Sequence, residues 1–474
     1  MPPTPDFPDA HHRYQFVTGK LAASALRGVV EKLAQKHGFD YVIDVLPITV
    51  AALMTPKWLS RNLHVHDDIS HVILPGFLKT DPDWPLKIPE TTEVLVGPKD
   101  CRELPEWFGD QRTPPDLSRH DIEIIAEINH VPRLSTHEFL RQSKYLIDQG
   151  ADRIDIGCDP SRRCRDTADY VRAAVEAGIQ VSIDTFDSWE ASTAVGAGAG
   201  LVLSVNSTNR DQASDWGCEV VAIPDSPSDL SSLFETAEFL EKRSVPHRLD
   251  AILEPIGSGL FASLERYAET RRRFPSVGMM MGIGNVTELT DVDSAGLNFL
   301  LLAICQELKV DSVLTTQVIN WARSSVRECD VARRLVRHAI TESVPPKRLS
   351  DELVMLRDPR LRPFPEGALD DLANAIRDNN YRIFAQDDQL HLLSAGIHLS
   401  DGDAFRLFER LMQEQASDNV DASHAFYLGY ELAKATISIQ LGKQYEQDRS
   451  LDWGMLTVQE DLHRLTRTSR HRKG

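Results

Sequence analysis

The chain has 474 residues, which is too many for one hydrophobic core and enough for two or three domains. Its hydrophobic fraction of 42% and charged fraction of 26% are typical of a folded globular protein, so they argue against a disordered or fibrous chain. The net charge of -19 argues against nucleic acid or an anionic membrane surface as the main partner, because both repel an acidic protein.

The cysteines and the first residues predict a cytoplasmic protein. Six cysteines are scattered without a CxxC pair or a dense disulfide framework, which is typical of a reducing compartment. The N-terminal residues lack the basic region and apolar stretch of a signal peptide. No apolar segment approaches the roughly 20 residues that a bilayer span requires, so we expect no membrane partner.

Residues 1–116 alternate between short apolar runs and helical patterns, which predicts a small parallel α/β domain. Strands are expected at residues 14–17, 40–45, 71–74 and 93–96. The turn Thr18-Gly19-Lys20 lies at the first strand-to-helix junction, where free backbone N–H groups can bind phosphate. It lacks the spaced glycines of a nucleotide fingerprint, so a simple tight turn is the plainer interpretation.

Residues 117–345 contain strand-like runs with a regular spacing. Eight are expected, at residues 123–128, 152–156, 179–184, 201–205, 219–223, 250–253, 277–281 and 311–314. Helical patterns lie between them, and each strand–helix unit takes roughly 20 to 35 residues. Eight such units predict a closed (β/α)8 TIM barrel, and an open doubly wound sheet is the structural alternative.

The regular strand–helix pattern ends near residue 346, and residues 346–474 predict a separate C-terminal α+β domain. A proline-rich connector leads to a helix near residues 369–377 and two β-like runs at 382–385 and 390–393. Further helices are expected at residues 404–412 and from Asp421, a plausible N-cap, through Leu441. The predicted fold class is therefore α/β, with a central barrel between a small N-terminal α/β domain and this C-terminal domain.

Most of the predicted barrel strands end in a polar side chain. These residues are Asn129, Asp155 with Asp159, Asp184, Asn206, Glu254 and Asn285. A single aspartate after a strand is often only the N-cap of the next helix. Several carboxylate and amide groups from different strands are harder to explain by capping, because the C-terminal ends of barrel strands meet at one mouth.

Such groups suit the polar edge of a pterin ring. That edge offers an amino group and a ring N–H as donors, which a carboxylate can accept in a bidentate pair, while an amide supplies both a donor and an acceptor. Burying the edge without partners is costly. We expect Asp184, Asn206 and Glu254 to satisfy it, and we expect Asp155 and Asp159 to belong to the same substrate-binding site.

Five segments resemble strand ends of the pterin-binding barrel family, which includes dihydropteroate synthases and methyltetrahydrofolate-dependent corrinoid methyltransferases. The segments are Ala126-Glu-Ile-Asn129, Arg153-Ile-Asp-Ile-Gly-Cys-Asp159, Val181-Ser-Ile-Asp-Thr185, Ser204-Val-Asn206 and Leu253-Glu-Pro255. The resemblance implies that Asp184 and Asn206 bind the pterin ring and that Glu254 takes the place of a family aspartate. It also implies that Asn129 lies near a diphosphate and Mg²⁺, with a catalytic role.

The seventh and eighth strand ends depart from the synthase pattern. They read Gly282-Ile-Gly-Asn285 and Leu314-Thr-Thr-Gln317, without the cations that hold the diphosphate and the aminobenzoate in the synthases. Asn285 instead resembles the asparagine with which the methyltransferases assist methyl transfer. The loop after the second strand carries Arg162, Arg163 and Arg165, which suit phosphate oxygens, although a solvated loop is the alternative.

The whole chain resembles a branch of dihydropteroate synthase-like proteins associated with tetrahydromethanopterin biosynthesis. The segments at residues 282–290, 314–322 and 424–431 carry this likeness. It implies a cytoplasmic transferase of one-carbon cofactor biosynthesis that condenses a dihydropterin-6-methyl diphosphate with an arylamine of the ribofuranosylaminobenzene phosphate type, using Mg²⁺. A homodimer is also implied. A methyl-tetrahydropterin-dependent methyltransferase, with a methyl acceptor as its partner, and a non-catalytic pterin-binding scaffold are the alternatives.

Overall fold

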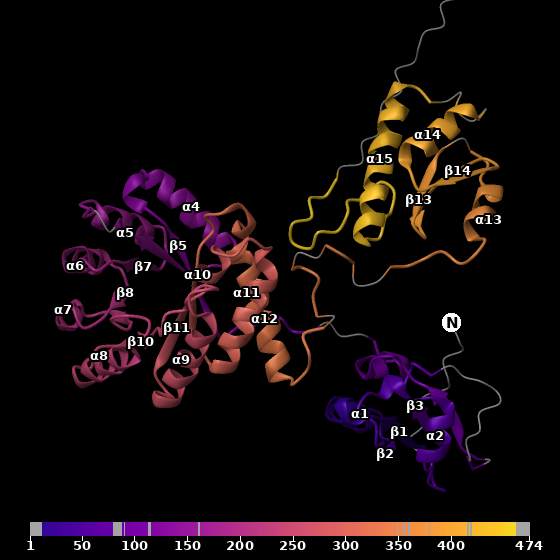
Figure 1. Cartoon of the computed structure of the whole chain (residues 1–474), viewed down its shortest axis with the longest axis horizontal. Coiled ribbons are helices and arrows are strands. Elements are labelled where there is room, and N and C mark those ends of the chain that lie inside the picture. The colour runs from indigo at the N-terminus through magenta and orange to yellow at the C-terminus, as the bar shows by residue number, and fades with distance from the viewer. Residues whose placement is uncertain are drawn as a thin grey trace, which may run out of the picture. The chain divides into compact units, whose positions relative to one another are not determined.

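The computed structural model describes residues 12–78, 88–89, 91–111, 115–159, 162–347, 349–353, 356–358, 361–378, 380–414, 417 and 420–460. They contain a four-stranded sheet, a closed barrel and a three-stranded sheet (Figure 1). One compact unit takes in the chain up to Arg119 together with His338–Pro346, and the other takes in His120–Arg337 and the chain from Lys347. The three-domain division at residues 116 and 345 stays a prediction.

The N-terminal sheet is parallel throughout and has the strand order β2-β1-β3-β4. Its strands are β1 (Arg13–Thr18), β2 (Asp40–Val45), β3 (His71–Leu74) and β4 (Glu93–Val96), and its helices are α1 (Ala23–His37), α2 (Pro56–Asn62) and α3 (Leu104–Trp107). The backbone N–H groups of Lys20 and Leu21 donate to Ile48 O and Thr49 O, at 2.9 and 3.0 Å. Because those donors are already bonded, the turn after β1 is a tight turn and presents no phosphate cradle there.

Eight parallel strands form the closed barrel, which confirms the predicted fold class and excludes the open sheet. They are β5 (Glu123–Ile128), β6 (Arg153–Gly157), β7 (Val181–Asp184), β8 (Leu201–Val205), β9 (Glu219–Ala222), β10 (His247–Leu249), β11 (Gly278–Gly282) and β12 (Ser312–Thr315). Pairing of β12 with β5 closes the ring. The barrel helices lie outside the strands (Figure 1).

Most of these outer helices bury apolar side chains in the barrel core. They are α4 (Thr136–Asp148), α5 (Thr167–Glu176), α6 (Ser188–Ala197), α7 (Arg210–Trp216), α8 (Leu230–Lys242), α9 (Leu260–Arg273), α10 (Gly284–Thr287), α11 (Ser294–Leu308) and α12 (Ser325–Thr341). In α4, for example, Phe139 and Leu146 are buried two turns apart. Ser135 caps the same helix by accepting from Glu138 N at 3.2 Å, which satisfies one of its free N–H groups.

The sixth barrel strand is the one element that the sequence placed wrongly. The prediction put it at residues 250–253, whereas β10 spans His247–Leu249. The strand stops because the Asp250 carboxylate accepts from Ile252 N at 2.8 Å and Ile252 adopts a left-handed φ of 61°. The charged start of the strand looked like a loop, yet Arg248 lies inside the barrel, where it pairs with Glu219 at 2.8 Å.

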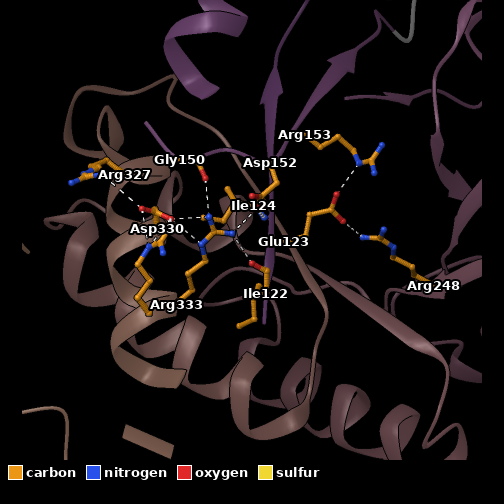
Figure 2. A network of polar contacts seen from close by, with 11 residues as sticks. Ile122, Glu123, Ile124, Gly150, Asp152, Arg153, Arg248, Arg327, Asp330 and Arg333 are labelled. Atoms are coloured by element: carbon orange, nitrogen blue, oxygen red, sulfur yellow. Dashed lines mark hydrogen bonds and ion pairs between the residues drawn. The ribbon is translucent and has the colours of Figure 1, made fainter. Parts of the chain in front are cut away.

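Side chains that face the barrel axis form three layers, because alternate residues of each strand point inward. The lowest layer is an ion-pair network in which Glu123 contacts both Arg153 and Arg248 (Figure 2). The middle layer is apolar and consists of Ile125, Leu201, Leu203, Val221 and Met280, with Leu314 packed against it. By the same alternation, the top layer, at the C-terminal mouth, contains Glu127, Asp155, Asp184 and Asp250.

The C-terminal part combines strands and helices, as predicted, and its sheet is antiparallel. It contains α13 (Ala368–Ala375), β13 (Arg382–Gln386), β14 (Gln389–Ser394), β15 (Ile397–Asp401), α14 (Ala404–Gln413) and α15 (Ala422–Leu441). The third strand was not predicted. Leu390, Leu392, Leu407 and Leu428 form part of a core of its own. Among all the helices described, none is both long and apolar enough to cross a membrane.

Candidate active site at the barrel mouth

Asp184 lies at the end of β7 and is the centre of the polar cluster. Its Oδ1 accepts a hydrogen bond from Ser204 Oγ at 2.6 Å. Ser204 makes this contact from a left-handed φ of 71°, at a register shift between Val202 and Val205 of β8. Such strain is often found at functional sites. Burial raises the pKa of Asp184, although the hydrogen bond from Ser204 lowers it.

Asp155 is a fully buried carboxyl group in β6, the strand that pairs with β7 on one side. It lies in register with Glu127 of β5 and Ser182 of β7. Ser182 Oγ donates to Asp155 Oδ1 at 2.6 Å, and Oδ2 has no hydrogen-bond partner among the described residues. Burial raises the pKa of Asp155 well above its ordinary value, and the charges of Asp184 and Glu127 raise it further.

Glu127 is a mouth residue that the sequence analysis did not single out. Its Oε1 lies over Gly157, where a Cβ atom would approach it to 2.8 Å. Burial raises the pKa of Glu127 to about 7, together with the charges of Asp184 and Glu288. The signal was present in the sequence, because Glu123, Glu127 and Asn129 share one side of an alternating strand whose other side is apolar.

Asp250 is the second missed carboxyl group. It follows β10 and is buried, and the hydroxyl of Tyr267 and the backbone N–H of Ile252 both donate to its Oδ1. Burial raises the pKa of Asp250 to about 6, with a smaller contribution from Asp184. Among the described residues, none of Glu127, Asp155, Asp184 and Asp250 forms an ion pair with lysine or arginine.

Asn206 and Asn285 are the amide groups of the mouth. Asn206 Oδ1 accepts from Thr208 N at 3.0 Å and from Thr208 Oγ1 at 2.7 Å. Its Nδ2 donates to nothing within the described chain. Asn285 is the reverse case: its Nδ2 donates to Leu253 O at 3.0 Å, which leaves Oδ1 as an exposed acceptor. One amide therefore offers a donor and the other an acceptor.

Glu254 is held by a helix. Its Oε2 forms an ion pair with Arg266 of α9 at 2.7 Å, and the same guanidinium group donates to Ile252 O at 3.2 Å. A Cβ at Gly259 would come within 2.9 Å of this oxygen, so the carboxylate is closely packed against the start of α9. The role of Glu254 as a ring ligand stays a prediction.

Asn129 follows β5, and its Oδ1 is buried without a hydrogen-bond partner among the described residues. An unpaired buried oxygen is costly, and it is also a suitable Mg²⁺ ligand. The described residues hold no group of three or more His, Cys, Asp or Glu that could bind a metal ion. Asn129 therefore fits a Mg²⁺ ion only as one ligand beside oxygens of a substrate.

The arginine-bearing loop follows β6 at the same end of the barrel. Arg163 pairs with Asp187 at 2.6 Å and stacks 5.4 Å above Trp189, so it is already engaged. Arg162 and Arg165 are exposed. The predicted ligand Asp159 forms an ion pair with Arg133 at 2.9 Å.

Buried Glu190 of α6 ties this loop to the end of β7. Its Oε1 accepts from Cys164 N at 2.5 Å, and its Oε2 accepts from the Thr185 hydroxyl. Glu190 thus fixes the segment that follows the exposed Arg162 without contacting the mouth carboxyls by any described hydrogen bond.

Comparisons of the sequence with known proteins identify one family and one relative. Residues 12–90 match a family of unknown function, DUF6513. An uncharacterized protein of Methanocaldococcus jannaschii is 24% identical over 536 residues, covering 92% of this chain and 98% of its own.

The chain is also similar to solved dihydropteroate synthases. The Yersinia pestis enzyme with a pterine-sulfa conjugate is 17% identical, with a TM-score of 0.37, over 48% of this chain and 95% of its own. The Coxiella burnetii enzyme with pteroic acid is 16% identical, with a TM-score of 0.38, over 50% and 98%. The Xanthomonas albilineans enzyme with 7,8-dihydropteroate is 18% identical, with a TM-score of 0.37, over 49% and 96%.

Proposed function

We propose that the barrel mouth binds a pterin and that the protein is a dihydropteroate synthase-like transferase. The observation that carries this proposal is the combination of Asp184, at the end of β7, with Asn206, which directly follows the neighbouring strand β8. With Ser204 on one oxygen of Asp184 and Thr208 on the amide oxygen of Asn206, the groups left for a ligand are a carboxylate acceptor and an amide donor. A pterin edge requires both.

The surrounding carboxyl groups extend this match. The aminopyrimidinone edge has more N–H donors than a single carboxylate can accept, and the mouth supplies a further unpaired acceptor at Asp155 Oδ2. The site has many acceptors and no ion-paired cation at its carboxyl layer among the described residues. This composition favours a ligand that is rich in N–H groups over an anionic one at that depth.

For the reaction, we propose condensation of a dihydropterin-6-methyl diphosphate with an arylamine. The amine nitrogen bonds to the methylene carbon, the bond from that carbon to the diphosphate oxygen breaks, and the nitrogen loses a proton. Exposed Arg162 and Arg165 would stabilise the departing diphosphate, and Asn129 would contribute an oxygen ligand to Mg²⁺ at the same end of the barrel. An arylamine of the ribofuranosylaminobenzene phosphate type, as in tetrahydromethanopterin biosynthesis, would use the same arginines.

Asn285 supports a second candidate, methyl transfer from a methyl-tetrahydropterin. Its exposed Oδ1 is free to accept a hydrogen bond from a protonated ring nitrogen, because its Nδ2 is bonded to Leu253 O. Protonation there would weaken the nitrogen–methyl bond as an acceptor attacks the methyl group. This reaction needs no diphosphate site, which agrees with the finding that no described lysine or arginine forms an ion pair with the carboxyl layer. A scaffold that binds pterin without turnover is the remaining outcome.

The variant Asp184→Asn tests the binding site. It removes the charged acceptor while keeping the shape, and the loss of a charged hydrogen bond of about 1.5–3 kcal/mol predicts that pterin affinity falls about 10- to 100-fold. Titration calorimetry with 6-hydroxymethyl-7,8-dihydropterin measures this. Asp169→Asn, an exposed position on α5, is the matched control and should bind like wild type. Unchanged binding by Asp184→Asn would disprove the site.

The reaction is tested by incubating the full chain with dihydropterin diphosphate, Mg²⁺ and each arylamine in turn. Release of diphosphate that depends on the amine supports condensation. Absence of release with every amine, together with demethylation of a methyl-tetrahydropterin by a thiol or corrinoid acceptor, would support the second candidate. Binding of pterin without either reaction identifies a scaffold.

A further inference from the structure

Helix α15 of the C-terminal part is apolar on its solvent side as well as on the side that faces the sheet. Its inner side contributes Leu428 and Leu432 to the core that also contains residues of β14 (Figure 1). On its outer side Phe426 is 75% exposed, Tyr430 48% and Ile437 39%. A helix that is apolar all round is usually buried, so the outer side has the character of a surface that meets a partner.

The outer side of α15 also carries no charge. The helix has only two Asp, Glu, Lys or Arg residues, Glu431 and Lys434, and these are buried and form an ion pair at 2.8 Å. A solvated helix face normally carries charged side chains, as α9 does with exposed Glu269 and Arg272. The composition of the outer side, with two aromatic residues and no charge, is that of the core of an interface.

The spacing of the exposed residues indicates what kind of partner fits. Six of them follow one another at alternating intervals of three and four positions, which is the spacing of the a and d positions of a coiled coil. Such a narrow seam packs its side chains between those of a second helix. A Cβ atom placed on Gly429, beside these residues, would meet no atom within 4 Å, so a helix can approach closely there. The six residues form the α15 seam: Ser423, Phe426, Tyr430, Ala433, Ile437 and Gln440.

The α15 seam is complementary to itself about a two-fold axis. In an antiparallel pair of α15 helices centred between Glu431 and Leu432, Phe426 lies opposite the partner's Ile437, and Tyr430 lies opposite the partner's Ala433. An aromatic side chain thus meets an aliphatic one and a large side chain meets a small one, and the symmetry repeats each contact. At both ends of the seam a serine lies opposite a glutamine. Because the seam carries no charge, two copies of a chain with a net charge of -19 meet there without opposing like charges.

We propose that the α15 seam is an interaction surface for a second copy of this chain, with which it forms an antiparallel two-helix coiled coil. This inference is independent of pterin binding at the barrel mouth. The 20 residues of α15 form a helix about 30 Å long. A seam of that length buries on the order of 1,000 Å² over both copies, which is the lower end of specific interfaces, so we expect a dimer that dissociates on dilution. High salt should not weaken it, because no ion pair between the copies holds it.

Sedimentation velocity of the full chain from about 1 to 100 μM tests this surface. Wild type should move from the mass of one chain towards that of two as concentration rises. Ile437→Glu places a carboxylate opposite the partner's Phe426 twice in the dimer, so its dissociation constant should rise about 100-fold or more. Neither Ile437 nor Phe426 belongs to the apolar core of the C-terminal part, so the variant should fold, which circular dichroism checks. Leu300→Glu, at an exposed position of α11, is the matched control and should dimerise like wild type.

A mixture of two variants tests the antiparallel register. Phe426→Lys alone should also weaken the dimer, since it buries a lysine against an apolar residue in each half. Mixing it with Ile437→Glu joins the lysine of one copy to the glutamate of the other and keeps one native contact between Phe426 and the partner's Ile437. Dimers should therefore return in the mixture, and high salt should weaken these mixed dimers although it does not weaken the wild-type dimer.

Each result supports or overturns the proposal. Wild type that keeps the mass of one chain at the highest concentration overturns it. A dimer that survives Ile437→Glu, or that Leu300→Glu disrupts, also overturns it, because the copies then meet elsewhere. If Ile437→Glu does not fold, Phe426→Lys decides, and an unchanged dimer in that variant overturns the proposal. Loss of the dimer in both single variants supports the surface, recovery in the mixture supports the register, and absence of recovery overturns the antiparallel pairing.

Discussion

Glu127 is a carboxyl group whose burial is compensated by no ion pair among the described residues. Its pKa is raised to about 7 by burial and by the charges of Asp184 and Glu288. The native state therefore holds the Glu127 proton more tightly than the unfolded chain does. The contribution of this proton to the free energy of unfolding is fully present below the pKa of the unfolded chain, and it is lost as pH rises through about 7.

The variant Glu127→Gln should remove this pH dependence. Glutamine cannot ionise, so we expect the variant to be more stable than wild type at pH 8 by about 2–3 kcal/mol, and the gain to shrink towards pH 5. Urea unfolding at the two pH values measures the difference. Glu265→Gln, at an exposed position of α9, is the control and should show little change at either pH. Equal pH dependence in wild type and Glu127→Gln would contradict the buried-carboxyl argument.

Residues such as Asp184 and Asn206 could be selected from sequence because they follow apolar runs whose ends are clear. Asp250 could not, since the predicted strand began at Asp250 and the charged side chain of Arg248 concealed the true strand before it. Hydrogen bonding within the site is also invisible in sequence. Nothing in the Glu254 motif predicts the ion pair between Glu254 and Arg266, which lies twelve residues later.

At the scale of elements, α12 is anchored to the lower end of the barrel through Arg333, which is 2% exposed. Its guanidinium group contacts Asp330 and Asp152 and donates to Ile122 O at 2.7 Å and Gly150 O at 3.1 Å (Figure 2). Burial alone would raise the pKa of Asp330, but hydrogen bonds from Arg334 and Arg333 hold it below its ordinary value.

Arg333→Met should therefore be strongly destabilising. The methionine fills a similar volume but leaves two carboxylates short of a partner and two carbonyl oxygens unbonded, so we expect a loss of about 3–5 kcal/mol. Arg337→Met provides a matched control on the same helix: Arg337 pairs with exposed Asp121 and should cost less than about 1 kcal/mol. Chemical denaturation compares the two, and similar losses for both variants would show that the Arg333 network is not the anchor of α12.

The elements that could be predicted are those whose sequence pattern agrees with the packing of the element in the fold. Seven of the eight barrel strands matched within two residues because their apolar runs are buried in the barrel wall. β15 escaped prediction because its residues, Ile-His-Leu-Ser-Asp, are largely polar for a strand. The strand is stabilised by its pairing with β14, which follows a turn at Gly396 with a φ of 72°, and not by the strand propensity of its own residues.

At the scale of the whole molecule, each compact unit has hydrophobic cores made only from its own residues. The N-terminal unit packs around residues such as Phe16 and Leu59, and the barrel packs around Ile124 and Val220. A ligand in the barrel mouth contributes its binding free energy to the unit that folds around it. The mouth carboxyl groups Glu127, Asp155, Asp184 and Asp250 all belong to the second unit.

Calorimetric unfolding should therefore show a transition that responds to pterin and another that does not. At a free pterin concentration of about 100 times its Kd, the barrel gains about 2.7 kcal/mol, which at about 2–4 °C per kcal/mol for a barrel of this size raises its Tm by about 5–10 °C. The transition of the N-terminal unit should stay where it is. Asp184→Asn is the control, because at the same pterin concentration its about 10- to 100-fold weaker binding should reduce the shift to about half or less without altering the other transition. A single transition that moves as a whole would show that the two units unfold cooperatively, and the absence of any shift at saturating pterin would contradict binding in the barrel.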